Sequence, residues 1–297
     1  MMALKVVIAG GTGFIGTHLQ KRFRQDGYEV VMISRQSPHV DWTDHAAIVE
    51  ALEGAELLIN LAGKSVNCRY HKRNKEAIMS SRTDTTRRLG EAVSACVQPP
   101  KLWINSSTAT IYRHAEDRPM TEQSGEIGSG FSVEVAQAWE QQLFAFTLPH
   151  TRQIALRIAI VLGRDGGVNE PYQRLVKLGL GGVQGKGTQM FSWIHIEDVY
   201  RIIQFAMAHP ELEGAINCSA PNPVPNHEQM RMLRQSLGRR FGMPAPRWLL
   251  ECGAVLIRTE TELVLKSRWV LPERLLQAGY QFRYATLEAA LEEIAGR

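Results

Sequence analysis

Three glycines at fixed spacing, directly after an apolar run, constrain the fold of this chain more than any other feature. Residues 4–9 (LKVVIA) are typical of a buried parallel strand, and residues 10–16 (GGTGFIG) follow them. Apolar residues then recur at helical spacing as far as Asp26. A glycine turn between strand and helix lets the backbone approach a pyrophosphate, and the helix N-terminus offers unpaired N–H groups. The sequence therefore predicts a dinucleotide site rather than a purely structural turn. Its predicted residues are Gly10, Thr12, Gly13, Phe14, Ile15 and Gly16.

The residues after the second predicted strand indicate which dinucleotide is bound. Residues 29–33 (EVVMI) form that strand, and Ser34 and Arg35 follow it without an acidic residue. NAD sites usually have a carboxylate here to accept from the ribose 2′-hydroxyl, whereas an arginine binds the 2′-phosphate of NADP. We therefore expect Ser34 and Arg35 to select NADP(H). The alternative is that Arg35 is simply a solvated surface residue.

Strands and helices continue to alternate along the first half of the chain. Further apolar strands are predicted at 57–59, 102–104 and 155–162, and further helices at 46–52 and 82–95. This alternation is typical of a parallel sheet with helices on both faces. We therefore predict an α/β protein in which a Rossmann doubly wound parallel sheet carries a smaller C-terminal substrate lobe.

The second half of the chain is less regular. We expect residues 1–165 to form the NADP-binding Rossmann domain, with later strands contributed by about residues 190–220. Residues 166–297 would then form the substrate lobe and a C-terminal helical segment. Glycines cluster between residues 179 and 187, which predicts a mobile loop that acts as a lid.

Charge and cysteine spacing exclude several classes of protein. The net charge is only +4, from 34 Lys and Arg against 30 Asp and Glu, which does not indicate a nucleic-acid partner. The chain shows no run of about 18 apolar residues and no signal-like N-terminus, so we expect a soluble protein without a membrane partner. The cysteines lack a CxxC pair, which predicts no disulfide framework, no metal site and a cytoplasmic location. They are Cys68, Cys96, Cys218 and Cys252.

Further motifs carry a resemblance to a known family. Besides the glycine turn they are residues 60–63 (NLAG), 106–112 (SSTATIY) and 191–199 (FSWIHIEDV). Together they resemble the extended short-chain dehydrogenase/reductases of the sugar-nucleotide epimerase and dehydratase type. A second set of segments comprises residues 75–82, 139–140, 162–167 and 270–282. With this set, nearly the whole chain resembles the atypical NADP-binding epimerase family proteins that have a C-terminal domain of unknown function.

The resemblance implies roles for individual residues. The residues implied on the adenosine side of the cofactor are Leu61, Ala62 and Gly63. Glu76 and Arg82 match further positions that contact the cofactor. Chemically, an arginine binds a phosphate and a glutamate accepts from a hydroxyl. The alternative is that Glu76 and Arg82 belong to a solvated basic helix.

The catalytic pattern of that superfamily is incomplete in this chain. Its usual members combine a Ser or Thr with a YxxxK dyad, in which the lysine lowers the tyrosine pKa for proton transfer. Thr108 is at the Ser/Thr position, four residues before Tyr112, and these two are the candidate catalytic residues. The dyad positions fall on Ser132 and Ala136, and no tyrosine lies between Tyr112 and Tyr172.

Two functions remain open at this point. The first is an NADP-dependent, epimerase-like oxidoreductase that acts on an unknown small molecule, with Tyr112, His195 or Glu140 as proton donor. Each donor has a structural alternative: packing for Tyr112, burial with a hydrogen bond for His195, and a helix-surface carboxylate for Glu140. The second function is that of a catalytically silent NADPH-binding sensor or regulatory protein. The chain is expected to be a monomer or a homodimer.

Overall fold

Six parallel strands form the central sheet of the structure, a computed structural model that describes residues 3–167, 169–245 and 266–296. Their order across the sheet is β10 (Gly214–Cys218), β5 (Arg152–Ile158), β4 (Leu102–Thr108), β3 (Leu57–Asn60), β1 (Lys5–Ala9) and β2 (Glu29–Ile33). In this order β2 lies on one side of β1, and β3, the next strand along the chain, lies on the other side of β1. A ligand crevice is therefore expected at the carboxyl ends of β1 and β3. The predicted α/β fold with a Rossmann sheet is confirmed.

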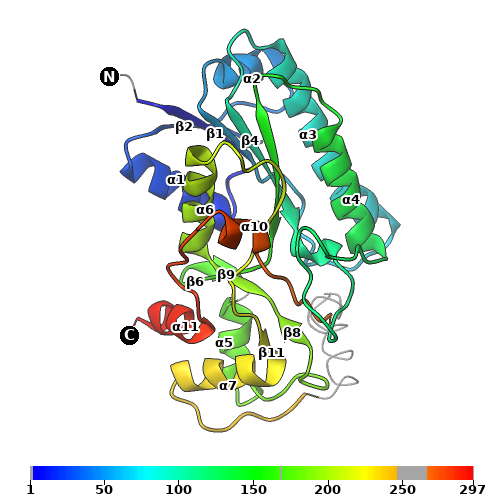
Figure 1. The fold of residues 1–297 in the computed structure, drawn as a ribbon, viewed down its shortest axis with the longest axis vertical. Coiled ribbons are helices and arrows are strands. Elements are labelled where there is room, and N and C mark those ends of the chain that lie inside the picture. Colours follow the sequence, from blue (N-terminus) through cyan, green and yellow to red (C-terminus); the bar gives the residue numbers. More distant parts are fainter. Residues whose placement is uncertain (1–2, 168, 246–265, 297) are drawn as a thin grey trace.

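Helices cover both faces of the sheet because its strands are apolar on both sides. Val6 and Ile8 of β1 pack in one cluster with residues of α1 (Phe14–Gln25) and α6 (Ile196–Ala208). Val7 and Ala9 pack in a second cluster on the opposite face. The helices of that face, seen beside the sheet in Figure 1, are α2 (His45–Leu52), α3 (Lys72–Ala95) and α4 (Phe131–Phe144).

One predicted strand is divided between two sheets. Residues 155–162 form a single apolar run, but β5 ends at Ile158 and β6 (Ile160–Gly163) begins two residues later. β6 pairs with β9 (Trp193–His195) outside the central sheet. The prediction of one strand was wrong because apolar character does not show which neighbour a strand pairs with. The predicted helix 82–95 is the second half of α3, which begins earlier, at Lys72.

The smaller lobe follows β6 and lies below the central sheet in Figure 1. It contains β7 (Gly166–Gly167), α5 (Asn169–Lys177), β8 (Met190–Phe191), β11 (Val224–Pro225), α7 (Asn226–Ser236) and α11 (Leu287–Ala295). All of residues 190–220 are described, and among their strands only β10 joins the central sheet. Helix α10 (Glu273–Gln277) packs against β10. β8 pairs instead with β11.

The glycine-rich segment 179–187, for which the sequence predicted a mobile loop, is hydrogen-bonded to the segment that contains Met243 and Ala245. The Gly182 N–H donates to the Met243 carbonyl (3.0 Å), and the Ala245 N–H donates to the Val183 carbonyl (2.8 Å). A Cβ at Gly182 would lie 2.5 Å from the Met243 carbonyl carbon. The glycine therefore permits a close contact between two backbones.

The C-terminal segment 266–271 runs between the two lobes and bonds to both. The Arg268 N–H donates to the carbonyl of Met190 (2.8 Å) in the smaller lobe. On the other side, the Met120 N–H donates to the carbonyl of Trp269 (2.7 Å). This segment therefore ties the smaller lobe to the loop that follows β4.

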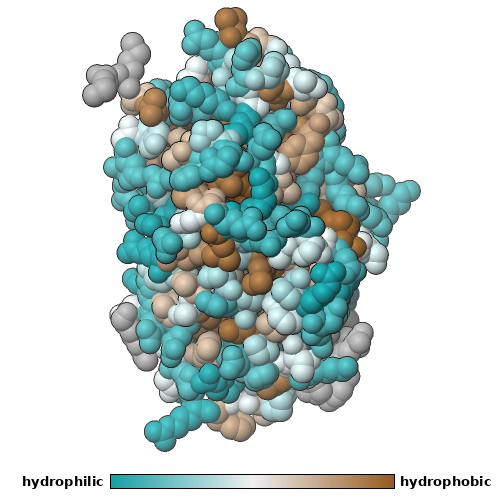
Figure 2. Space-filling view, viewed as in Figure 1, coloured by the Kyte–Doolittle hydropathy of each residue, from teal (hydrophilic) through white to brown (hydrophobic). Residues whose placement is uncertain are grey.

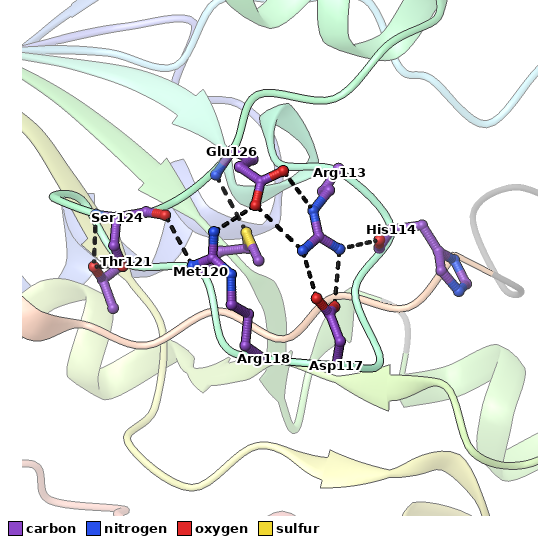
Figure 3. A network of polar contacts seen from close by, with 8 residues as sticks. All are labelled: Arg113, His114, Asp117, Arg118, Met120, Thr121, Ser124 and Glu126. Atoms are coloured by element: carbon purple, nitrogen blue, oxygen red, sulfur yellow. Dashed lines mark hydrogen bonds and ion pairs between the residues drawn. The ribbon is translucent and has the colours of Figure 1, made fainter.

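The loop that carries Met120 has a network of ion pairs at the surface (Figure 3). Arg113 donates to both carboxylate oxygens of Asp117 (2.9 and 2.8 Å) and to Glu126 (3.0 Å). Arg118 donates to Glu126 as well. The Arg113 guanidinium holds the pKa of the Asp117 carboxyl well below its usual range.

The face shown in Figure 2 carries hydrophobic side chains in separate small groups among hydrophilic ones. Within the three described ranges, no helix is long and apolar enough to span a bilayer. The same ranges contain no group of three or more His, Cys, Asp or Glu side chains placed to hold a metal ion. Cys68, Cys96 and Cys218 are free thiols, and Cys252 lies outside the described residues.

Candidate cofactor and substrate site

The three motif glycines have different surroundings at the turn between β1 and α1. Gly10 has a left-handed φ of +73°, and a Cβ there would lie 2.5 Å from the Cα of Ala62. A Cβ at Gly16 would lie 2.3 Å from the Cα of Gly11. A Cβ at Gly13, by contrast, would meet no other atom within 4 Å. Gly10 and Gly16 thus allow the turn to fold tightly, while Gly13 leaves open space at the N-terminus of α1.

The first turn of α1 offers backbone donors to a ligand. Gly13 is the N-cap residue and provides no side chain to accept from the first N–H groups of the helix. The Phe14 ring packs against the β6–β7 turn, where a Cβ at Gly163 would lie 2.7 Å from the ring. Ile15 packs against the core, and Thr12 is exposed. Phe14 and Ile15 would therefore contact a ligand at this edge through their backbone N–H groups and not through their side chains.

Ser34 and Arg35 follow β2 and differ in exposure. The buried Ser34 hydroxyl accepts from the Gln36 N–H (3.0 Å) and lies 2.8 Å from Nδ1 of His39, so it fixes the turn. Arg35 is exposed, and no hydrogen bond or ion pair joins it to another residue that the structure describes. Its guanidinium is therefore available to an external phosphate.

Arg82 of α3 lies across Gly63. A Cβ at Gly63 would be 3.0 Å from Cζ of Arg82. Nη1 of Arg82 donates to the carbonyls of Ile78 (3.0 Å) and Lys64 (3.1 Å), and its guanidinium lies 5.0 Å from the ring centre of Trp139. Burial lowers the pKa of Arg82 to about 10, so the side chain stays charged at neutral pH. No carboxylate of the described ranges pairs with it, which leaves a cation beside Gly63 for a phosphate.

Glu76 lies on the same helix as Arg82 but is exposed. Neither a hydrogen bond nor an ion pair joins it to the part of the chain that the structure describes. Its predicted contact with the cofactor stays a prediction.

A buried hydrogen-bond network supports the turn after β3. Oδ1 of the fully buried Asn60 accepts from the Ala62 N–H (3.0 Å). Nδ2 of Asn60 donates to Asn105 (2.6 Å) and to Thr86 (3.1 Å), and Trp139 also donates to Thr86 (3.0 Å). Asn60 thereby fixes the backbone of the predicted adenosine-side turn.

Thr108 ends β4 with a hydroxyl that is able to donate. Its Oγ1 accepts from the Thr110 N–H (3.2 Å) at the start of the short helix η1 (Ala109–Ile111). None of the residues in the described ranges accepts its proton. The half-buried Thr108 hydroxyl therefore has a donor available for a substrate oxygen.

The Tyr112 hydroxyl is both a hydrogen-bond donor and a hydrogen-bond acceptor. Its side chain is 2% exposed, donates to Oδ1 of Asn217 (2.9 Å) and accepts from Arg157 (2.8 Å). Burial raises the pKa of this hydroxyl. These contacts favour the packing alternative for Tyr112, and its catalytic role stays a prediction.

Glu140 is a buried partner of Arg157. Two N–H groups of Arg157 donate to its carboxylate (2.9 and 2.7 Å), and Ser107 donates to the same group (2.6 Å). Glu140 is 9% exposed, so the expectation of a helix-surface carboxylate was wrong. The available signal was Arg157, the one charged residue in the apolar run 155–162.

The two dyad positions on α4 are enclosed by other residues. Ala136 is fully buried in a cluster with Ala109, Tyr112 and Val133. The Ser132 hydroxyl is buried and has no hydrogen-bond partner within the described ranges. A lysine at position 136 would bury its ammonium group among apolar side chains, which is unfavourable.

His195 lies in the smaller lobe and is buried and hydrogen-bonded. Its Nδ1 accepts from the Glu197 N–H (3.3 Å), so the proton is on Nε2, which lies 3.2 Å from the Glu293 carboxylate. Burial lowers the pKa of His195, although Glu293 opposes this shift. The geometry matches the structural alternative for this residue.

His195 is expected to make stability depend on pH. A histidine whose folded pKa is lowered takes up its proton more readily when unfolded, so its contribution is present above the ordinary pKa of about 6.5 and is lost as pH falls below it. His195→Asn keeps an N-cap acceptor and removes this titration. Urea unfolding at a series of pH values should show that the variant loses less stability than the wild type below about pH 6.5. Parallel curves for the two proteins contradict this assignment.

Two cations near η1 could not be found from local motifs. Nζ of Lys266 donates to the Thr110 carbonyl (2.9 Å), and Nε of Arg268 donates to the Thr110 hydroxyl (3.2 Å). Lys266 follows Thr110 by 156 residues, so only the folded chain brings them together.

Comparison with known proteins identifies relatives over the whole chain. The model of the NAD dependent epimerase/dehydratase family matches residues 6–219, and that of a domain of unknown function, DUF1731, matches residues 245–294. The human epimerase family protein SDR39U1 is 34% identical over 298 residues, which cover 98% of this chain and 99% of the relative. The Bacillus subtilis epimerase family protein YfhF is 29% identical over 303 residues, 98% of each chain. The crystal structure of human SDR39U1 (isoform 2) with NADPH has a TM-score of 0.90 and 31% identity, covering 99% of this chain and 100% of that one.

Proposed function

The chain belongs to the NAD dependent epimerase/dehydratase family, as its motifs indicated, and on this premise we propose that it binds NADPH at the carboxyl edge of the central sheet. The observation that carries the proposal is the open space at Gly13, beside unpaired N–H groups of α1. The human relative that was crystallised with NADPH is similar over the whole chain, which supports the same cofactor here.

The phosphates and the adenosine of the cofactor have matching groups in this chain. The N–H groups of the first turn of α1 would hold the pyrophosphate, and Arg35 would hold the 2′-phosphate. The turn that Asn60 fixes would line the adenosine, and Arg82 would bind an anionic group beside Gly63. None of these groups is occupied by a carboxylate of the described ranges.

Replacing Arg35 with alanine should weaken NADPH far more than NADH. A charge-assisted hydrogen bond to a phosphate contributes about 1.5–3 kcal/mol, which corresponds to a loss of about 10- to 100-fold in NADPH affinity. Fluorescence titration with both dinucleotides measures the ratio. Equal weakening of NADPH and NADH contradicts the assignment of the 2′-phosphate to Arg35.

The reaction class that this site supports best is oxidation or reduction of a small molecule. Bound NADPH supplies a hydride to a carbonyl carbon. Thr108 would hydrogen-bond the substrate oxygen, since its hydroxyl proton has no described acceptor. An alcohol is a weak acid at neutral pH, so Thr108 would orient the substrate while the proton comes from another donor.

A second function, that of an NADPH-binding sensor, is favoured by the enclosed dyad positions. Ala136 is fully buried, and the Tyr112 hydroxyl is engaged with Asn217 and Arg157. The deciding experiment is an NADPH fluorescence titration followed by a screen for absorbance loss at the nicotinamide band with pooled carbonyl metabolites. Turnover supports the oxidoreductase, and tight binding without turnover supports the sensor. Absence of NADPH binding contradicts both.

A further inference from the structure

A hollow of about 570 Å³ lies at the C-terminal end of α7, in the smaller lobe. Sites for small molecules have volumes of about 300–1,000 Å³, so the hollow has room for one. Figure 1 shows α7 at the end of the molecule that is away from the central sheet. The hollow is therefore separate from the proposed cofactor site, and an inference about it goes beyond the proposed function. Its lining residues are Arg231, Arg234, Gln235, Gly238, Arg239 and Arg240.

A glycine turn after α7 brings these lining residues together. Gly238 has a left-handed φ of +66°, and its N–H donates to the Gln235 carbonyl (3.0 Å). The Arg239 N–H donates to the Arg234 carbonyl (2.8 Å). This pair of bonds is the Schellman motif, which ends a helix and turns the chain away from the helix axis. The turn thereby places Arg239 and Arg240 beside the last turns of α7, where they line the same hollow.

The described part of the chain does not neutralise the arginines of this hollow. No Asp or Glu of the described ranges lines it. Arg239 and Arg240 are exposed, and neither side chain forms a hydrogen bond or an ion pair with a described residue. Arg231 lies 3.9 Å from the Glu228 carboxylate, which is too long for a hydrogen bond. Four cations therefore line one hollow, and binding of an anion relieves their mutual repulsion.

The dipole of α7 accounts for one of the four arginines. A cation is favourable in the last turn of a helix, and Arg234 lies there, with one N–H donating to the Gly181 carbonyl (2.6 Å). Arg239 and Arg240 lie beyond the end of α7, and the Schellman bonds already satisfy two of its last carbonyls. The helix does not require these two charges, which favours a ligand as their partner.

The lining chemistry indicates a phosphate ligand. A guanidinium forms paired, charge-assisted hydrogen bonds with phosphate oxygens. Oε1 of Gln235 accepts from Arg231 (3.2 Å), so the NH₂ group of Gln235 can donate to a ligand in addition. Within the described ranges, neither an aromatic nor an aliphatic residue lines the hollow. It therefore offers no stacking surface for a base and no contact for an acyl chain.

We propose that this hollow is a binding site for a compact polyphosphate, a chain of two or three phosphates. Such a chain carries three or more negative charges in a small volume, which matches the four guanidinium groups. Arg239 and Arg240 bind the chain through paired hydrogen bonds, and Arg231, Arg234 and Gln235 contact it from α7. Inorganic polyphosphate and a nucleoside triphosphate share this chemistry.

The test is calorimetric titration of the full chain with tripolyphosphate, ATP and citrate, in saturating NADPH so that the cofactor site is not available to them. We expect one tripolyphosphate to bind per chain, more tightly than citrate. ATP should bind no more tightly than tripolyphosphate, because no stacking surface lines the hollow, and tighter binding of ATP would identify a nucleotide as the source of the phosphates. Arg239→Gln and Arg240→Gln should each weaken tripolyphosphate by about 10-fold, and the double variant by about 100-fold, because each removes a charge-assisted bond.

Arg24→Gln is the matched control. Arg24 is an exposed arginine in the last turn of α1, outside the hollow, and its replacement should leave tripolyphosphate binding unchanged. The proposal is overturned if wild type does not bind tripolyphosphate, if citrate binds as tightly, if the double variant keeps full binding, or if Arg24→Gln weakens binding as much as Arg239→Gln does. Circular dichroism checks that the variants fold, which is expected because the replaced side chains are exposed. If the chain does not bind NADPH, the same titrations without it still compare the variants, so failure of the cofactor site and failure of this site are distinguishable.

Discussion

Replacing Gly13 with valine should abolish measurable NADPH binding while the chain stays folded. A Cβ at this position meets no atom of the protein within 4 Å, and the backbone (φ −88°, ψ −177°) is an extended conformation that valine adopts readily. The added side chain would fill the space that the proposed site leaves for the pyrophosphate. We expect NADPH affinity to fall by at least about 100-fold, or about 2.7 kcal/mol. Loss of a glycine N-cap should lower the free energy of unfolding by only about 1 kcal/mol.

Gly16→Val is the matched control for this change. It adds the same side chain three residues later, but there the Cβ would lie 2.3 Å from the backbone of Gly11. Backbone atoms cannot rotate away, so this variant should lose about 3 kcal/mol of stability. Thermal unfolding should therefore show a larger loss of stability for Gly16→Val than for Gly13→Val, whereas NADPH fluorescence should show that the Gly13→Val protein, although folded, does not bind NADPH. Full NADPH binding by a folded Gly13→Val protein would rule out a pyrophosphate at this turn.

The central sheet could be predicted from the sequence because parallel strands leave a strong local signal. β1, β2 and β3 are short apolar runs followed by turns, and each was located to within about one residue. The glycine turn was equally readable, since its three glycines follow a strand and begin a helix. What the spacing did not reveal was that, of these three, Gly13 alone faces open space.

The rest of the site depends on contacts between distant segments, which leave no local pattern. The run 155–162 is uniformly apolar apart from Arg157, so nothing in it marks the point where β5 ends and β6 joins another sheet. Lys266 and Arg268 reach η1 only because the C-terminal segment passes between the lobes. Glu140 resembled a surface residue because its partner, Arg157, lies on a different element.

Arg157→Leu should destabilise the protein at least as strongly as Gly16→Val. Arg157 and Glu140 form a pair with two hydrogen bonds, and each side chain is 11% exposed. Removing the guanidinium leaves a buried carboxylate whose remaining side-chain partner in the described ranges is Ser107. Breaking one side of a buried pair costs about 3–5 kcal/mol, and Tyr112 loses a donor in addition. Urea unfolding followed by circular dichroism measures this loss.

The double variant Glu140→Leu/Arg157→Leu shows whether the unpaired charge causes the loss. Replacing both partners removes the charge as well as the bonds, so the double variant should be more stable than Arg157→Leu alone. Arg113→Leu provides the comparison at the surface, because the Arg113–Asp117 pair also has two hydrogen bonds but is solvated. The unfolding midpoint of the Arg113→Leu protein should hardly change. If Arg157→Leu behaves like Arg113→Leu, the buried pair contributes little, and the network linking Ser107 to Tyr112 does not hold the end of β4 in place. If the predicted order is found, the double variant also permits a test of whether Thr108 needs that network for turnover, because it removes the network from a protein that still folds.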